Sequence, residues 1–85
     1  MADSEPLKLY VKTWCPWCIR AIAMLDQAGY RYELIDVEAD PADYREMIRL
    51  SGQSLTPTLV AGDRVLPDFG PPELTAFLEK HRLRP

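Results

Sequence analysis

Both cysteines of this 85-residue chain lie in Thr13-Trp14-Cys15-Pro16-Trp17-Cys18, where two residues separate them. A strand-like run, Leu7-Lys8-Leu9-Tyr10-Val11, precedes this stretch, and a helix-like run from Ile19 to Ala28 follows it. A Cys-x-x-Cys pair at a strand-to-helix junction is typical of a dithiol redox site. The sequence therefore predicts a fold whose remaining elements support two reacting sulfurs.

The position of the pair predicts different roles for the two sulfurs. If the helix begins near Cys15, its first N–H groups lack helical partners and point toward that sulfur, where the helix dipole adds positive charge. Both effects favour the thiolate, and cysteines in such sites have pKa values of roughly 3.5–7.5 instead of about 8.5. Cys18 returns to the same face one turn later, within disulfide reach. We expect Cys15 to be the exposed attacking sulfur and Cys18 the more buried resolving one. Pro16 suits the first helical turn, and Lys12 is placed to add positive charge beside the thiolate.

Other uses of the two cysteines are less consistent with the sequence. A structural disulfide between them would close so small a loop that it would stabilise the fold little. Structural zinc takes four protein ligands, whereas the chain offers these cysteines and one distant histidine, His81. Two half-sites joined in a dimer remain an alternative, as do inert thiols. The redox interpretation requires no metal and no bound cofactor. His81 is then expected to be a surface residue near a helix C-terminus, where the dipole favours it.

Length and composition predict a single domain over residues 1–85, with its core at about 7–82. The chain is 47% hydrophobic and 27% charged, which argues for a folded core. Its net charge of −3 and the absence of a basic run argue against nucleic-acid partners. No apolar stretch approaches membrane-spanning length, and Met1–Pro6 lacks a signal pattern. We therefore expect a cytoplasmic monomer without membrane contact, and a dithiol in that compartment is more often catalytic than structural.

The first half of the chain predicts a strand–helix–strand unit with parallel strands. Leu7–Val11 is apolar on both sides apart from Lys8, as in a central buried strand. The helix is expected to end at Gly29, a plausible left-handed cap. Tyr30–Val37 reads as the second strand. Its inward side chains are expected to be those of Tyr30, Tyr32 and Leu34.

The second half predicts a helix, a β-hairpin and a final helix. Asp40 is a good N-cap for a helix that ends at Gly52. Pro57 is expected to be the first residue of the third strand, because proline within sheets is confined to such positions. A turn at Gly62-Asp63 leads to a fourth strand, Arg64–Leu66. The expected inner stripe of the earlier helix is Tyr44, Met47 and Ile48, and that of the last helix is Leu74, Phe77, Leu78 and His81.

The chain resembles the glutaredoxin family over Leu7–His81. The resemblance lies in the element order β-α-β-α-β-β-α, the Cys-Pro-aromatic-Cys motif and a Thr56-Pro57 pair before the third strand. The resemblance implies an α/β, thioredoxin-like fold with a four-stranded mixed sheet and three helices. It implies a glutathione-dependent thiol–disulfide oxidoreductase that reduces protein disulfides and mixed disulfides with glutathione. It also implies that the bond before Pro57 is cis. Trp17 stands where the family more often has tyrosine or phenylalanine.

The resemblance also implies a set of site residues around catalytic Cys15 and Cys18. Glutathione would be a co-substrate, and the partners would be proteins with disulfides or bound glutathione. Thr56 would pair through its backbone N–H and C=O with glutathione or an extended peptide, as strands pair. Lys12 would bind a carboxylate of glutathione, to which Arg45 or Arg49 offers a weaker approach. The glutathione-binding residues implied are Lys12, Trp17, Thr56, Pro57 and Asp68.

The chain departs from the family pattern after the fourth strand. Glutaredoxins commonly have two glycines there, followed by an acidic pair, whereas this chain has Leu66-Pro67-Asp68-Phe69-Gly70-Pro71-Pro72-Glu73. Asp68 is the candidate for the acidic contact. The loop is similar to that of glutaredoxin-like redoxins that serve ribonucleotide reductase and are reduced by thioredoxin reductase, which gives an alternative function. An iron–sulfur carrier is less consistent with the sequence, because such carriers mostly have a small residue where Pro16 stands.

Overall fold

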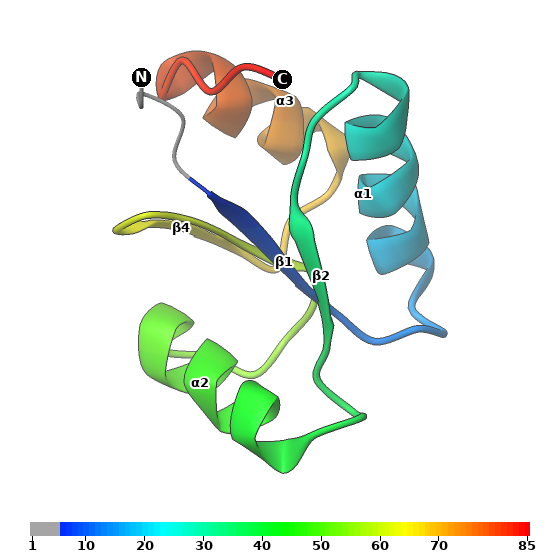
Figure 1. The fold of residues 1–85 in the computed structure, drawn as a ribbon, viewed down its shortest axis with the longest axis vertical. Helices are drawn as coiled ribbons and strands as arrows, with labels where there is room; N and C mark the ends of the chain where they lie inside the picture. Colours follow the sequence, from blue (N-terminus) through cyan, green and yellow to red (C-terminus); the bar gives the residue numbers. More distant parts are fainter. Residues whose placement is uncertain (1–5) are drawn as a thin grey trace.

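A central sheet separates one helix from the other two in the computed structural model, which describes residues 6–85 (Figure 1). The sheet has four strands in the order β2-β1-β3-β4. Strands β1 and β2 are parallel, and the β1–β3 and β3–β4 pairs are antiparallel. This is the mixed sheet with three helices that the resemblance implied. The elements are β1 (Leu7–Val11), α1 (Pro16–Gln27), β2 (Glu33–Asp36), α2 (Pro41–Ser51), β3 (Thr58–Ala61), β4 (Arg64–Pro67) and α3 (Pro71–Lys80).

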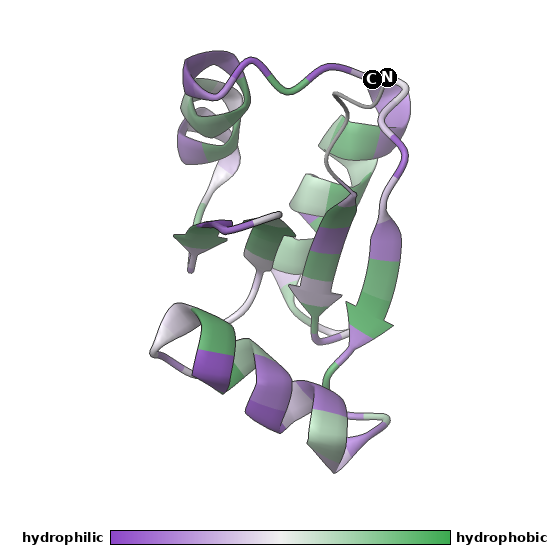
Figure 2. Cartoon of the chain, turned by 60° about the vertical axis from the view of Figure 1, so that its left-hand side comes forward, coloured by the Kyte–Doolittle hydropathy of each residue, from purple (hydrophilic) through white to green (hydrophobic). Residues whose placement is uncertain are grey.

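Each face of the sheet has its own hydrophobic cluster. Helices α1 and α3 cover one face, where Leu9, Leu25 and Leu74 are fully buried. Helix α2 covers the other, where Met47 packs with Tyr10. Figure 2 shows hydrophobic residues along the strands between helices that carry both polar and apolar residues. Because both faces are covered, β1 is the buried central strand that its composition predicts.

Local signals place most element ends where the sequence predicted them. The Asp40 side chain accepts a hydrogen bond from the Ala42 N–H, 2.9 Å away, and Pro41 begins α2. Gly52 ends that helix with a φ of 73°, a left-handed conformation that glycine adopts without steric cost. Strand β4 begins at Arg64, directly after the predicted turn, and continues one residue beyond Leu66. The Thr56–Pro57 bond is cis, as the resemblance implied.

Two predicted inward side chains are exposed. Strand β2 covers only Glu33–Asp36, and Leu34 on it is 51% exposed. Strand β2 is an edge strand, with a neighbouring strand on one side alone. On α2, Ile48 is 39% exposed, and Leu50 packs against the cluster around Met47 instead.

Within residues 6–85 the helices are too short or too polar to span a bilayer. The longest of them, α1, has 12 residues, whereas a transmembrane helix needs about 20.

Leu9 and Leu34 are register partners on β1 and β2, and they form a matched pair for a stability test. Leu9 is fully buried, so Leu9→Ala should leave a cavity and lower the free energy of unfolding by about 2–5 kcal/mol. Leu34 is half exposed, so Leu34→Ala should cost less than about 1 kcal/mol. Urea unfolding of both variants measures the difference. Equal losses would contradict the half-exposed position of Leu34.

Candidate active site

Cys15 is the N-cap residue of α1, so the predicted helix start beside it is confirmed. Its Sγ accepts a hydrogen bond from the Cys18 N–H at 3.4 Å. Pro16 occupies the first helical turn, where its missing N–H costs no helical hydrogen bond. The sulfur thus takes the position that a serine or aspartate oxygen usually occupies at a helix N-terminus.

Hydrogen bonds around Cys15 favour its thiolate. Burial of the sulfur acts to raise the pKa of Cys15, but this is outweighed by hydrogen bonds from the Cys18 thiol, from the N–H groups of Cys18 and Trp17, and from the Thr56 side chain. The net result is a pKa below the ordinary value for cysteine. The first turn of α1 contains no acidic residue, so no carboxylate there opposes the thiolate.

Cys18 differs from Cys15 in burial and in the direction of its pKa shift. Cys18 is 0% exposed, and Cys15 is 8% exposed. Burial raises the pKa of Cys18, and the neighbouring Cys15 raises it further. Cys15 is the more accessible of the two, as expected, but it is itself buried, so the expectation of an exposed sulfur is wrong. The Thr56 carbonyl oxygen lies 3.9 Å from its Sγ.

The segment before β3 is held by side-chain hydrogen bonds that the sequence did not reveal. The Thr58 hydroxyl is fully buried, donates to the Leu55 carbonyl at 2.8 Å and accepts from Gln53 Nε2 at 3.1 Å. Gln53 Oε1 accepts from the Leu55 N–H at 2.6 Å. These contacts fix the backbone that presents Thr56 to Cys15.

Asp68 lies beside the cis proline, and its role as the acidic contact stays a prediction. Its N–H donates to the Pro57 carbonyl at 2.9 Å, which ties the loop after β4 to the segment before β3. Asp68 has a φ of 49°, and its side chain is exposed.

Lys12 lies between two aromatic rings at the end of β1. Its Nζ is 5.8 Å from the centroid of the Trp14 ring and 5.6 Å from that of Tyr44. Both distances are within the range of a cation–π interaction, about 6 Å. Neither ring was predicted to be part of the site.

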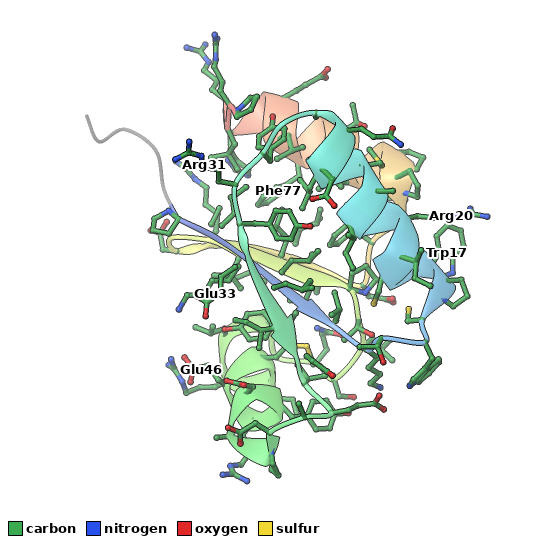
Figure 3. All side chains as sticks on the ribbon, turned by 45° about the vertical axis from the view of Figure 1, so that its right-hand side comes forward. Trp17, Arg20, Arg31, Glu33, Glu46 and Phe77 are labelled. Atoms are coloured by element: carbon green, nitrogen blue, oxygen red, sulfur yellow. The ribbon has the colours of Figure 1, made fainter. Side chains whose placement is uncertain are left out.

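Trp17 projects from the first half of α1 together with Arg20 (Figure 3). It is 51% exposed, and the Arg20 guanidinium lies 5.0 Å from its ring centroid. A Cβ on Gly70 would lie 3.4 Å from the Trp17 ring, so Gly70 and the ring are close neighbours. Trp17 therefore borders the site and also contacts the loop before α3. Arg20 was not predicted here, although its spacing from Trp17 places both on one helix face.

The remaining candidates lie elsewhere or are already paired. Arg49 bonds to Glu46 within α2, and Arg45 is exposed on the same helix. His81 caps the end of α3, as expected, with its ring 4.6 Å from that of Phe77. In the part of the chain that the structure describes, no three Asp, Glu, His or Cys side chains gather in a group able to hold a metal ion.

Comparisons with known proteins point to one family. A glutaredoxin family model matches residues 7–66. A glutaredoxin from Pseudomonas aeruginosa is 31% identical over 58 residues, which are 68% of this chain and 69% of that protein. Glutaredoxin 3 from Escherichia coli is 32% identical over 53 residues, which are 62% of this chain and 64% of that protein.

Two similar solved structures represent the two possible kinds of relative, one bound to glutathione and one with a thioredoxin-like activity profile. The buckwheat glutaredoxin–glutathione complex is 27% identical with a TM-score of 0.67, over 92% of this chain and 69% of that chain. The glutaredoxin-like protein NrdH-redoxin from Escherichia coli, described with a thioredoxin-like activity profile, is 25% identical with a TM-score of 0.72, over 94% and 96%. The two-cysteine site at the start of α1, the fold and the family match lead to one conclusion: the chain belongs to the glutaredoxin family of thiol–disulfide oxidoreductases.

Proposed function

We propose that the chain reduces protein disulfides and mixed disulfides with glutathione, and that glutathione is its reductant and co-substrate. The observation that carries the proposal is the hydrogen bond from the Cys18 N–H to the Cys15 sulfur, which makes Cys15 the better thiolate of the pair. The buckwheat relative in complex with glutathione supports the choice of co-substrate. The proposed setting is a monomer in the cytoplasm, where a reducing thiol pool keeps such cysteines reduced.

The first step is attack by the Cys15 thiolate on one sulfur of the substrate disulfide. The substrate S–S bond breaks, its second sulfur leaves as a thiolate and takes a proton from water, and Cys15 forms a mixed disulfide. Because burial raises the pKa of Cys18, that thiol stays protonated while Cys15 reacts. This division makes Cys15 the nucleophile.

The second step depends on the substrate. With a protein disulfide, Cys18 loses its proton and attacks the Cys15 sulfur, which releases the second substrate thiolate and leaves a Cys15–Cys18 disulfide. Two glutathione molecules then return this disulfide to two thiols and become one glutathione disulfide. With a glutathionylated protein, the mixed disulfide on Cys15 carries glutathione, and a second glutathione resolves it without Cys18.

The proposed binding residues surround Cys15. The backbone of Thr56, beside cis Pro57, is the proposed strand-like partner for glutathione or a peptide. Lys12 is the proposed partner of a substrate carboxylate. Trp17 and Asp68 border the site on the side of α3.

A second candidate is a redoxin reduced by thioredoxin reductase, and the start of α3 favours it. A helix N-terminus normally offers free N–H groups to an anion. Here Pro71 and Pro72 have none, and the Gly70 N–H donates to Glu73 Oε1 at 3.1 Å. Fewer donors therefore remain for the γ-glutamyl end of glutathione, which family resemblance would put there. The similarity to NrdH-redoxin supports the same candidate.

Serine variants separate the two proposed sulfur roles. Cys15→Ser should abolish reduction of every disulfide, because the attacking sulfur is gone. Cys18→Ser should keep deglutathionylation of a glutathionylated peptide at a rate of the same order, while losing reduction of a protein disulfide. Both activities are followed by release of free thiol. If Cys18→Ser proves inactive toward the glutathionylated peptide, the step without Cys18 is wrong.

The pH dependence of alkylation tests the activation of Cys15. The thiolate is the reacting form, so the rate rises with pH up to the pKa and levels off above it. The midpoint of this rise should lie below the pH of about 8.5 that is typical of free cysteine for Cys15, and above it for Cys18. Iodoacetamide labelling of the reduced protein, with each site quantified by mass spectrometry, measures both. A Cys15 midpoint at or above that of free cysteine would remove the basis of the proposal.

Coupled assays separate the two possible reductants. The oxidised protein should be reduced by glutathione, glutathione reductase and NADPH, and only slowly by thioredoxin reductase and NADPH. NADPH consumption at 340 nm reports both rates, and the Cys15→Ser variant gives the background. The reverse order of rates would favour the second candidate and overturn glutathione as the reductant, while the sulfur roles would stand.

A further inference from the structure

The environment of Lys12 combines the stretch after β1 with helix α2. Lys12 directly follows β1, Trp14 lies in the turn before α1, and Tyr44 belongs to α2. The Lys12 Nζ lies 5.8 Å from the Trp14 ring centroid and 5.6 Å from that of Tyr44. We call these three residues the Lys12 clamp. The clamp adjoins the catalytic sulfur in the chain, because the Cys15 N–H donates to the Lys12 carbonyl at 3.1 Å.

Both rings of the Lys12 clamp are fixed at their polar ends. The Trp14 Nε1–H donates to Glu38 Oε1 at 2.9 Å, in the turn after β2. The Tyr44 hydroxyl donates to the Ser54 carbonyl at 3.4 Å, in the loop that leads to Thr56. Trp14 is 65% exposed, so packing into the core does not account for its position.

The chemistry of the clamp suits an ammonium that must stay available. A carboxylate partner would hold Lys12 but would also neutralise its charge. Aromatic rings attract the ammonium through their quadrupoles and carry no net charge, so the two rings hold Lys12 without neutralising it. Restricting the flexible lysine before the substrate arrives also lowers the entropy lost on binding.

We propose that Trp14 and Tyr44 are positioning residues that hold the Lys12 ammonium ready for the carboxylate of an anionic disulfide substrate. The inference rests on the proposed function, because it takes Cys15 to attack that disulfide. It adds that the two rings set how strongly the site prefers an anionic disulfide. A carboxylate-bearing disulfide is preferred over a neutral or cationic disulfide of similar size, whichever reductant completes the cycle.

Three methanethiosulfonate reagents test this selection without any reductant. The Cys15 thiolate attacks the sulfenyl sulfur of each, forms a mixed disulfide and releases methanesulfinate. The sulfonatoethyl reagent is anionic, the methyl reagent is neutral, and the trimethylammonioethyl reagent is cationic. Rate constants at Cys15, divided by those for free cysteine and measured in the Cys18→Ser background at low ionic strength, give the charge preference.

Removing a ring should lower the preference for the anionic reagent over the neutral one. Trp14→Leu and Tyr44→Leu should each lower it about two- to fivefold, the range expected from one exposed cation–π contact. Lys12→Met should remove the preference. Trp14→Phe and Tyr44→Phe keep an aromatic ring and should largely restore it, which a purely structural role would not predict. Tyr32→Leu removes a ring whose hydroxyl bonds to Asp26, outside the clamp, and should change nothing.

The outcomes distinguish this inference from the proposed function. An unchanged preference in Trp14→Leu and Tyr44→Leu, or an equal loss in Tyr32→Leu, would overturn the clamp. Thermal unfolding of each variant checks folding, and Trp14→Leu is a second test at an exposed position if Tyr44→Leu is unstable. A slow reaction of Cys15 with the neutral reagent, in the Cys18→Ser protein with the Lys12 clamp intact, would instead count against the proposed function. That rate reports the reactivity of the thiolate alone.

Discussion

The hydrogen bond from the Cys18 N–H to the Cys15 sulfur joins the folding of α1 to the chemistry of the site. A helix N-terminus requires acceptors for its free N–H groups, and a nucleophilic sulfur requires donors that stabilise its thiolate. One contact satisfies both needs. The first turn of α1 contains no acidic residue, so the thiolate is the negative charge that complements the helix dipole there.

Sheet topology explains how Cys15 meets Thr56, which is 41 residues away in the sequence. Strands β1 and β3 are antiparallel, and Tyr10 near the end of β1 is paired with Thr58 at the start of β3. The end of β1, where the chain turns toward Cys15, therefore lies beside the start of β3, which the chain enters through Thr56 and Pro57. Hydrogen bonds from Gln53 and Thr58 then hold the entering segment in place.

The features that the sequence predicted are those set by neighbouring residues. The helix start at Cys15, the cap at Asp40 and the stop at Gly52 each depend on a few consecutive residues, and all three are confirmed. The exposure of Leu34 and Ile48 depends on which strand lies at the edge and which side of α2 meets the sheet. An alternating or helical pattern shows which residues share an apolar face. It does not show whether another element of the fold packs against that face.

The same limit applies to the site. Cys15 and Cys18 are recognisable from their spacing, whereas the contact of Lys12 with Tyr44 joins residues that are distant in sequence, and the role of Gln53 requires the folded loop. An aromatic residue next to the motif, such as Trp14, was the one available signal for a cation–π contact.

Glutathione and thioredoxin reductase would act on the same Cys15–Cys18 pair, so the reductant is selected by contacts outside the two sulfurs. The discriminating contacts lie on either side of it, and they differ in charge. Toward α2, the Lys12 ammonium is held by two aromatic rings that carry no net charge themselves. Toward α3, the Glu73 carboxylate accepts the Gly70 N–H, and two prolines remove further donors. Under the proposed function, a ligand with one carboxylate would use the Lys12 side alone, whereas a ligand with an anionic group at each end would also approach the Glu73 carboxylate. The choice between reductants therefore depends on the start of α3 more than on the activated cysteine.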